Sequence, residues 1–399
     1  MPTQATAEAN LKGSVRLGNY LRRLRSGYGY SLRRVEERAR AEGGEIDNSQ
    51  LSRYEKGICY PSFDKLRVLA SVFNVSIQAF SDVVDLEAYE ALKPEIADPK
   101  LLLDEGGAAF RGGELGRAFA YYERALEILL GAPAGEPGRE EQIARTRVSL
   151  ASALGRLGKL ALAEQELRQA LRIAERVGGT LQAQALLGIA NIHADQGDLF
   201  LAEIEAERAH AIAAREGLDT VAANALHIAA RVMADRRQDA AAIDRYRSAL
   251  DIYARLGNQD EATRIRINIG GCYVAMGKTR EGIRLLKAAL AEARALAHPR
   301  LEAHAWSSLG EAFYRLGDPK QAQMSLQQSD AICCTENEKY PDLLFFNAFY
   351  EWKMAGEATN PTRERIAFGR LKAVRSSLER VFPEVEAFDA FVERGRFDA

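Results

Sequence analysis

Apolar side chains recur with helical spacing along almost the whole chain, but two regions do so differently. The first helix-like run, residues 15–24, places Val15, Leu17, Leu21 and Leu24 close to one helix face. Further short runs separated by turns continue to residue 84 and predict five short helices. From about Asp104 onward the helical pattern becomes periodic. We therefore expect an all-α protein with a small N-terminal helical domain and a long array of repeats.

The periodicity is visible in the turns between predicted helices. Successive turn positions after Gly158 lie 39, 40, 40, 40 and 39 residues apart, at Gly197, Arg237, Gly277, Gly317 and Gly356. The preceding step, from Gly113 to Gly158, is 45 residues because it contains the Gly/Pro-rich loop GAPAGEPGRE. A fixed period of this length is typical of stacked helical hairpins.

Three columns in these repeats hold small residues. Counted from the turn position, they lie seven before, five after and twelve after it: Gly106, Ala151, Ala190, Ala230, Gly270, Gly310; Ala118, Ala163, Ala202, Ala242, Gly282, Ala322; Ala125, Ala170, Ala209, Ala249, Ala289, Ser329. Large apolar residues such as Tyr122 and Leu286 occupy a column nine after the turn. Small residues beside large ones at fixed offsets allow antiparallel helices to interlock.

This arrangement resembles the tetratricopeptide repeat (TPR). The resemblance implies an α-solenoid of six hairpins over residues 100–336, with residues 337–399 forming a degenerate seventh repeat and C-terminal capping helices. Because the period is 40 residues rather than the usual 34, we expect the second helix of each hairpin to be longer.

The residue pattern of the repeats is absent from residues 45–62, EIDNSQLSRYEKGICYPS. We predict a very short helix at about 48–56, begun by a capping box between Asp47 and Gln50 and ended by Gly57. Leu51 and Tyr54 form its apolar face. Its other face is polar, so neighbouring helices must hold the helix while its free face remains available for recognition.

This stretch and the following LRVLA resemble the Xre or phage-repressor type of helix-turn-helix domain, here residues 15–84, between a flexible N-terminus, 1–14, and a linker, 85–99. The resemblance implies that the third helix enters the major groove. It assigns base contacts to Asn48, Ser49, Gln50 and Arg53, and phosphate contacts to Ser31, Lys56, Tyr60 and Ser62. It also implies a structural pair between Glu55 and Arg25.

The charge distribution agrees with a nucleic-acid interface in this region. Residues 11–84 contain 13 Lys and Arg against 8 Asp and Glu, a balance of +5, whereas the rest contains 41 against 48, a balance of −7. A polyanion would therefore meet the N-terminal part first. The alternative is a small helical bundle that docks proteins, with its arginines merely solvated.

The TPR resemblance also implies that the first helices of the hairpins line a concave groove. Its predicted polar lining is Arg145, Gln184, Asn191, Asn224, His227, Arg231, Arg264, His304 and Glu311. Such side chains can hydrogen-bond an extended peptide and hold a carboxylate. The alternative is a hydrated wall without a ligand.

A helix-turn-helix domain joined to TPR repeats resembles the RRNPP group of bacterial regulators, which respond to short secreted peptides. The resemblance implies signal-dependent transcriptional control. A helix-turn-helix domain of this type binds a double-stranded DNA operator as a homodimer, and because the domain alone buries little surface for self-association, we expect the repeats to dimerise. We expect them also to sense a ligand, with a short peptide as the favoured one. The rival hypothesis is that the repeats bind a partner protein and no small signal.

Other classes of function find little support in the sequence. The N-terminus lacks the pattern of a signal peptide and no stretch is apolar enough to span a membrane, so we expect a cytoplasmic protein. The four cysteines show no C-x-x-C spacing, which predicts idle or buried thiols. The five histidines form no H-E-x-x-H pair, and neither G-x-S-x-G nor a Walker loop occurs. We expect no enzyme activity, cofactor or metal site.

Overall fold

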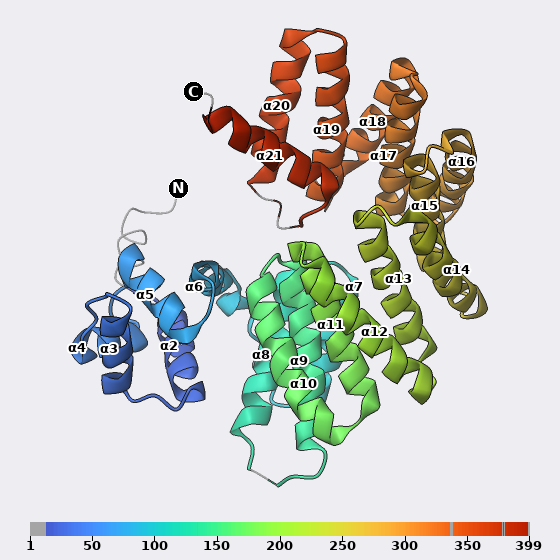
Figure 1. The fold of residues 1–399 in the computed structure, drawn as a ribbon. Coiled ribbons are helices and arrows are strands. Elements are labelled where there is room, and N and C mark those ends of the chain that lie inside the picture. The colour runs from blue at the N-terminus through green and yellow to red at the C-terminus, as the bar shows by residue number, and fades with distance from the viewer. Residues whose placement is uncertain (1–12, 134, 336–337, 377, 379, 398–399) are drawn as a thin grey trace. The chain divides into compact units, whose positions relative to one another are not determined.

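The computed structural model describes residues 13–133, 135–335, 338–376, 378 and 380–397. The chain forms two compact units, residues 1–173 and 174–399, whose helices are labelled in Figure 1. Residues 1–12 of the predicted flexible segment 1–14 lie outside the described part.

The first unit begins with the five predicted short helices. They are α2 (Val15–Gly27), α3 (Leu32–Ala41), α4 (Asn48–Glu55), α5 (Phe63–Phe73) and α6 (Ile77–Asp85). Apolar side chains from all five helices are buried, Leu21, Val35, Leu51, Leu69 and Phe80 among them, and they form the core of this small bundle. A 3-10 helix, η2 (Leu86–Leu92), occupies part of the predicted linker 85–99.

Helical hairpins follow in both units, as the repeat pattern predicts. The first pair is α7 (Pro99–Arg111) with α8 (Leu115–Gly131), followed by α9 (Arg139–Arg156) and α10 (Leu160–Val177). The second unit contains α11 (Gly179–Gln196), α12 (Leu199–Glu216), α13 (Asp219–Asp235), α14 (Asp239–Arg255), α15 (Gln259–Ala275), α16 (Thr279–Ala295), α17 (Pro299–Leu316) and α18 (Pro319–Cys333). Two antiparallel strands of two residues each, β1 (Cys334–Thr335) and β2 (Glu338–Lys339), are a small addition to the predicted all-α fold.

The predicted turn positions adopt left-handed backbone conformations in six cases, including Arg237 with φ 61° where the other repeats have glycine. The prediction for Gly356 is wrong. This glycine lies inside α19 (Pro341–Glu357), and the left-handed residue is Thr359, with φ 49°. The turn is shifted because Asn360 caps the next helix, α20 (Pro361–Arg375), whose first residue is proline.

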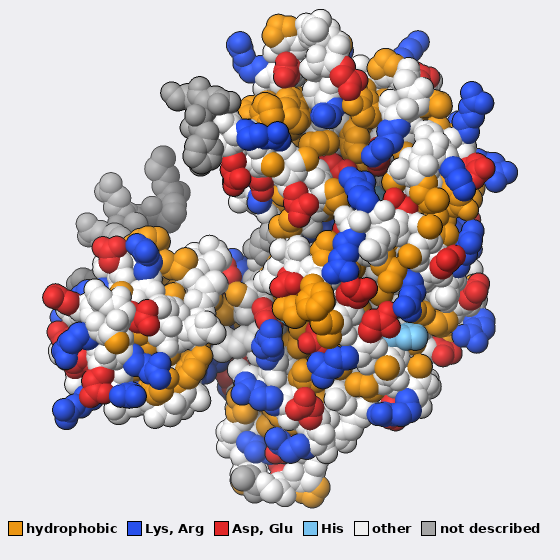
Figure 2. All heavy atoms as spheres, in the orientation of Figure 1, with side chains coloured by type: hydrophobic (Ala, Val, Ile, Leu, Met, Phe, Trp, Pro, Cys, Tyr) orange, Lys and Arg blue, Asp and Glu red, His pale blue; other side chains and the backbone are white. Residues whose placement is uncertain are grey.

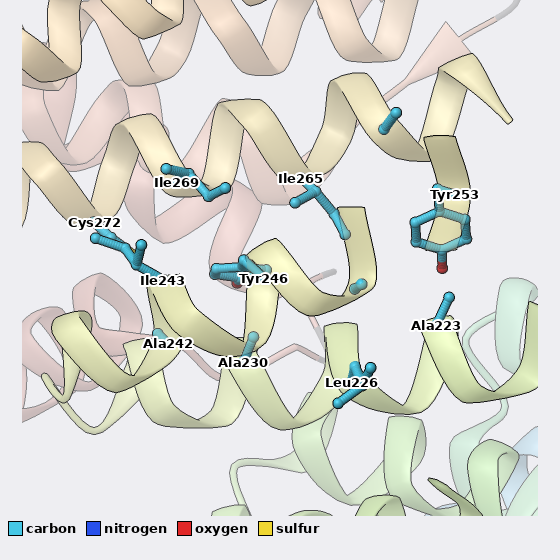
Figure 3. Packing of buried hydrophobic residues seen from close by; sticks show 12 residues of the cluster. Ala223, Leu226, Ala230, Ala242, Ile243, Tyr246, Tyr253, Ile265, Ile269 and Cys272 are labelled. Atoms are coloured by element: carbon cyan, nitrogen blue, oxygen red, sulfur yellow. The ribbon is translucent and has the colours of Figure 1, made fainter. Parts of the chain in front are cut away.

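All three columns of small residues are buried, which confirms their predicted packing role. A Cβ atom on Gly106 would lie 2.7 Å from the Tyr122 ring, and one on Gly270 would lie 2.8 Å from Leu286. Figure 3 shows the same principle in the middle of the second unit, where Ala230 and Ala242 lie near the large side chain of Tyr246. The small residues therefore allow the helices to approach closely.

The observed helix lengths differ from the expectation that the second helix of each hairpin is longer. In the second unit α13, α14, α15 and α16 each have 17 residues. The second helix is longer in the first hairpin, with 17 residues in α8 against 13 in α7, and shorter in another, with 15 in α18 against 18 in α17. The expectation of a longer second helix in each hairpin is therefore wrong.

Aromatic residues concentrate at the C-terminal end. Helices α19, α20 and α21 (Pro383–Phe397) surround a cluster that includes Phe345, Phe349, Tyr350, Phe382 and Phe388. The ring of Phe345 meets those of Phe382 and Phe388 edge to face, at centroid distances of 5.8 and 5.7 Å. This cluster covers the last hairpin, where we expected capping helices.

The described helices include no single one that is long and apolar enough to cross a membrane; only a pair bent by 110°, Phe63–Phe73 with Ile77–Leu92, meets the length and composition test. All four cysteines are free, with Cys272 and Cys333 buried. Burial raises the pKa of each of these two thiols to about 12.

Candidate nucleic-acid interface and first-helix face

Helix α4 has the predicted boundaries and one of the two predicted capping bonds. The Asp47 Oδ1 atom accepts a hydrogen bond from the Gln50 backbone N–H at 2.7 Å, and Gly57 adopts φ 67° just beyond the helix. The reciprocal side-chain bond of the capping box is not formed. Instead, Gln50 Oε1 accepts a hydrogen bond of 2.9 Å from Lys65 Nζ on α5. The long side chain of Lys65 brings its ammonium group to the amide from the neighbouring helix.

Helix α4 is held against α2 by close packing and by a buried ion pair. A Cβ atom on Gly18 would lie 2.6 Å from the backbone oxygen of Tyr54, so the two helices touch through their backbones. The predicted pair is confirmed: Arg25 Nε and Nη2 donate to the two oxygens of Glu55 at 2.6 and 2.9 Å. The bond to Glu55 raises the pKa of the Arg25 guanidinium despite partial burial.

The structure leaves the predicted DNA-contacting residues accessible. Six are exposed and two, Asn48 and Gln50, are half-buried; the exposed ones are Ser31, Ser49, Arg53, Lys56, Tyr60 and Ser62. The enclosed Oδ1 atom of Asn48 accepts no hydrogen bond from any described residue. The polar face of α4 therefore faces outward, as its sequence predicts.

Two of the predicted phosphate contacts lie at helix N-termini. Ser31 caps α3, and its Oγ accepts from the Arg34 N–H at 3.1 Å. Ser62 occupies the same position before α5 without a side-chain capping bond, so its hydroxyl is available to an external group. Helix N-termini favour phosphate oxygens because their backbone N–H groups are unpaired.

The surface around these helices carries both signs of charge. Figure 2 shows Lys and Arg side chains interspersed with Asp and Glu on the lobe that carries α3 and α4. Two acidic residues form ion pairs within α3: Glu37 pairs with Arg34 at 3.1 Å, and Glu36 pairs with Arg40 at 3.1 Å. On this face the net positive balance of residues 11–84 thus appears as scattered basic side chains rather than one uniform patch.

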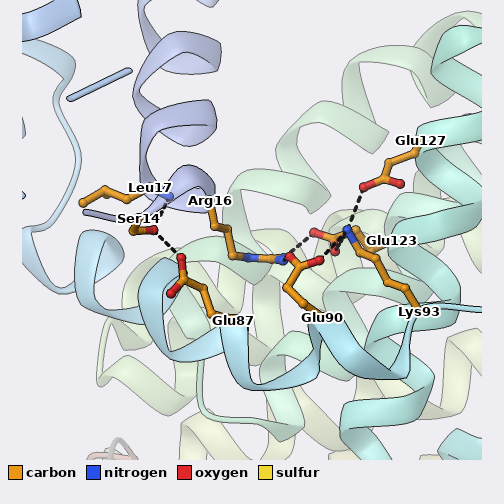
Figure 4. A network of polar contacts seen from close by, with 8 residues as sticks. All are labelled: Ser14, Arg16, Leu17, Glu87, Glu90, Lys93, Glu123 and Glu127. Atoms are coloured by element: carbon orange, nitrogen blue, oxygen red, sulfur yellow. Dashed lines mark hydrogen bonds and ion pairs between the residues drawn. The ribbon is translucent and has the colours of Figure 1, made fainter. Parts of the chain in front are cut away.

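A polar network, which sequence reasoning missed, joins α2 to η2 and α8 (Figure 4). Ser14 donates to Glu87, and Arg16 pairs with Glu90 and Glu123. The Arg16 side chain is only 11% exposed. Because its partners are 74 and 107 residues away, no local pattern in the sequence indicates these contacts.

A lysine completes this network from the other side. Lys93 Nζ lies 3.0 Å from Glu123 and 2.9 Å from Glu127. Burial alone would lower the pKa of Lys93, but the neighbouring carboxylates outweigh it and raise that pKa. Lys159 likewise contacts Asp82 and Asp85 of α6 at 3.2 and 2.7 Å. The N-terminal bundle is thus fastened to the first hairpins of its unit.

The first helices of the hairpins in the second unit share a polar surface, which we call the first-helix face. Neighbouring helices contact each other through some of the predicted groove residues. Arg231 Nη2 donates to Asn191 Oδ1 at 3.3 Å, and His227 Nε2 lies 3.2 Å from Asn268 Nδ2. Gln184, Arg264, His304 and Glu311 are half-buried on the same series of helices.

Two of the predicted groove residues are placed differently from the others. Arg145 belongs to the first unit, where it is exposed and pairs with Glu141 of its own helix at 2.9 Å. Asn224 accepts a hydrogen bond from the hydroxyl of buried Tyr253. Arg145 and Asn224 therefore stay predictions as groove residues, and Asn224 also takes part in the packing of its hairpin through Tyr253.

The two groove histidines are neutral over the usual pH range. Burial, followed by Arg231 and Arg264, lowers the pKa of His227 to about 3. Burial and Arg300 have the same effect on His304, whose pKa is also about 3. No group of three or more His, Cys, Asp or Glu residues in the described part of the chain is arranged to hold a metal ion.

Sequence reasoning also missed four charged residues on the first-helix face. Asp195 at the end of α11 pairs with Arg231 at 3.1 Å, and Asp342 at the start of α19 pairs with Arg300 at 2.6 Å. Arg380, from the segment between α20 and α21, approaches both carboxylates. These residues fall outside the repeat columns from which the groove was predicted.

Comparison with protein families agrees with this architecture. Residues 16–80 match a helix-turn-helix domain, and residues 144–176 and 261–333 each match a tetratricopeptide repeat model. The chain therefore joins an N-terminal helix-turn-helix domain to TPR repeats, as the sequence predicts. No curated protein matches the chain.

Solved structures of Rap proteins share the fold. A Rap protein in complex with competence and sporulation factor matches at 18% identity and a TM-score of 0.55, over 70% of this chain and 77% of that one. RapI in its apo form matches at 15% identity and 0.50, over 67% and 91%. The Rap conjugation gene regulator of plasmid pLS20 with the Phr* peptide matches at 13% identity and 0.53, over 91% and 96%.

Proposed function

We propose that the protein is a sequence-specific, Xre-type DNA-binding transcriptional regulator whose repeats form a homodimer and sense a ligand, with a short signalling peptide as the favoured ligand. The observation that carries the proposal is the packing of α4, which buries one side of the helix and leaves the other side exposed. Its apolar side and Glu55 are buried against α2, whereas Ser49 and Arg53 remain exposed. A helix held in this way can enter a major groove without rearranging the bundle.

The residues of α4 and its flanks suit two different tasks. Arg53 offers a guanidinium that can bind guanine O6 and N7, a contact that contributes roughly 1–3 kcal/mol of base discrimination. Lys56, Tyr60, Ser62 and Ser31 lie at helix ends and turns, where they can bind phosphates and position the domain.

The proposed sensing function rests on the first-helix face. It presents Asn191, Arg231, Arg264 and Glu311 next to apolar positions, a combination that can bind a peptide backbone and its charged groups. Two of the Rap structures that share the fold are complexes, one with competence and sporulation factor and the other with the Phr* peptide. This likeness supports a peptide as the first ligand to test.

The DNA-binding part is tested by selecting bound sequences from random duplex DNA with the purified full-length protein. We expect a reproducible motif whose binding weakens steeply as salt rises. Recovery of no motif, with equal retention of all sequences, would contradict sequence-specific binding. Sedimentation of the same sample measures whether the protein is a dimer.

The sensing part needs a separate experiment. Candidate peptides are titrated into the protein–operator complex, and operator affinity is followed at constant salt. A ligand shifts an equilibrium only through its different affinity for the two states. If peptides leave the affinity unchanged while a stoichiometric protein partner is recovered from native extract, the repeats bind a protein instead.

A further inference from the structure

The segment between α20 and α21 reaches the first-helix face of the second unit. Leu378 and Phe382 are buried in the aromatic C-terminal cluster. Between these two anchors, Arg380 and Val381 contact residues of a helix far away in the sequence, α11. The anchors therefore hold Arg380 and Val381 against the polar face of the repeats.

The contacts of this segment involve both its backbone and its side chains. The Val381 N–H donates a hydrogen bond of 2.7 Å to the backbone oxygen of Asp195 in the last turn of α11. The Val381 side chain packs beside Gly197, where a Cβ atom would lie 3.2 Å away. The last carbonyl groups of a helix have no partner within the helix, so they can accept a hydrogen bond from another segment. The backbone N–H of an extended peptide can make the same contact as that of Val381.

The guanidinium of Arg380 lies between two carboxylates. Its Nε is 3.8 Å from Asp195 Oδ1, and its Nη1 is 3.8 Å from Asp342 Oδ2. Asp195 belongs to α11 and Asp342 to α19, so one side chain connects the first and last of the five first helices in this unit. Its side chain is 33% exposed, and those of Asp195 and Asp342 are 22% and 14% exposed.

The electrostatics favour occupation of this position by a cation. Burial alone would lower the pKa of Arg380, but Asp195, Asp342 and Asp235 outweigh it and raise that pKa. Burial likewise tends to raise the pKa of Asp342, yet Arg300 and Arg380 hold it below its ordinary value. Removing Arg380 would leave each carboxylate with fewer positive neighbours.

We propose that Arg380 and Val381 are a built-in occupant of the first-helix face, and that they clasp α11 to α19 in the protein without ligand. An external ligand for this face must displace the clasp; this second part rests on the proposed sensing function. Release of Arg380 frees the two ends of the stack from each other, and ligand binding is thereby coupled to the arrangement of the repeats.

Hydrogen exchange of the full-length protein, without DNA or peptide, tests the clasp. We expect Arg380→Ala to accelerate amide exchange at least tenfold in residues 380–382 and at the facing ends of α11 and α19. Asp195→Asn should give a smaller change in the same segments, since it keeps the backbone acceptor for Val381. Arg245→Ala, which removes a 2.9 Å pair with Glu207 between two second helices, should leave these segments unchanged.

The two parts of the proposal fail in different ways. If Arg380→Ala exchanges like the wild type in these segments while circular dichroism shows both folded, there is no clasp, whatever the protein senses. Once a peptide ligand is found by titration, it should bind Arg380→Ala at least tenfold more tightly than the wild type. Equal affinities would show that the ligand does not displace the clasp.

Discussion

Arg16 of α2 forms an ion pair with Glu123 of α8, the second helix of the first hairpin. The same α2 supports α4, the proposed recognition helix, through the backbone contact at Gly18 and the pair between Arg25 and Glu55. A continuous series of contacts therefore runs from the first hairpin to the proposed DNA-reading surface. A change in the hairpin can therefore reach α4 through α2.

Replacing Arg16 with Ala should loosen the N-terminal bundle from the first hairpin. The side chain is mostly buried and bridges two carboxylates, so we expect a loss of about 1–3 kcal/mol in the free energy of unfolding. Urea titration combined with amide exchange in α2 measures it. The matched control is Arg33→Ala, which removes an exposed pair within one helix and should change stability by less than about 0.5 kcal/mol.

Breaking the pair between Arg25 and Glu55 should cost more than removing a surface charge. Glu55 is 5% exposed, and removal of one partner from a buried pair typically costs about 3–5 kcal/mol. Arg25→Ala should therefore destabilise the bundle and reduce binding to every DNA sequence alike. Arg25→Lys keeps the charge but cannot form both bonds, so its stability should lie between those of the wild type and Arg25→Ala. Wild-type stability of Arg25→Ala in thermal unfolding would refute this role.

Arg53→Ala and Lys56→Ala should separate base reading from phosphate binding. Both side chains are exposed near the end of α4. We expect Arg53→Ala to relax the preference at one base position by roughly 1–3 kcal/mol, and Lys56→Ala to weaken all sequences and reduce the salt slope by about 1. Competition binding with single-base operator variants decides between these roles. Identical behaviour of the two variants would show that the assignment is wrong.

Two adjacent glycines in α15 should respond oppositely to the same substitution. A Cβ atom on Gly270 would lie 2.8 Å from Leu286, so Gly270→Ala should destabilise the second unit by about 1–3 kcal/mol. Gly271 has no heavy atom within 4 Å of that position, and Gly271→Ala should stabilise the helix by about 0.5–1 kcal/mol. Chemical denaturation gives both values, and effects of equal sign would contradict the packing.

The stability of the second unit should fall as the pH drops below about 6.5. The pKa of His304 is about 3 in the folded protein but about 6.5 in the unfolded chain. In this interval the unfolded state binds a proton that the folded state does not, and the unfolding free energy decreases by about 1.4 kcal/mol per pH unit. His304→Gln should remove this share of the slope in denaturation series from pH 7 to 5. Parallel slopes for variant and wild type would exclude the effect.

The elements of the fold were predictable from the sequence because their signals are local or periodic. The boundaries of α4 follow from Asp47 and Gly57, and the hairpins follow from small residues at a 40-residue period. Local signals also explain the error at Gly356, since a glycine in register with earlier turns was outweighed by Asn360 and Pro361 four and five residues later. The lengths of the two helices in a hairpin depend on packing and carry no such signal.

The candidate sites divide in the same way. The outward residues of α4, such as Ser49 and Arg53, were found because a motif of adjacent residues places them on one face. Asp195, Asp342 and Arg380 were missed because they meet only after the repeats have stacked and the segment before α21 has folded back. Asn224 was assigned to the groove from its column, yet the hydroxyl of Tyr253 engages it.

The sequence by itself determined the all-α class, the five short helices followed by hairpins, and the polar face of α4, because spacing along the chain controls which side chains share a helix face. Only the tertiary structure decided that Arg16 fastens the N-terminal bundle to the first hairpin and that Arg380 lies between Asp195 and Asp342. Ion pairs between distant segments depend on where the packed helices bring their charges together, and that position is a property of the whole stack.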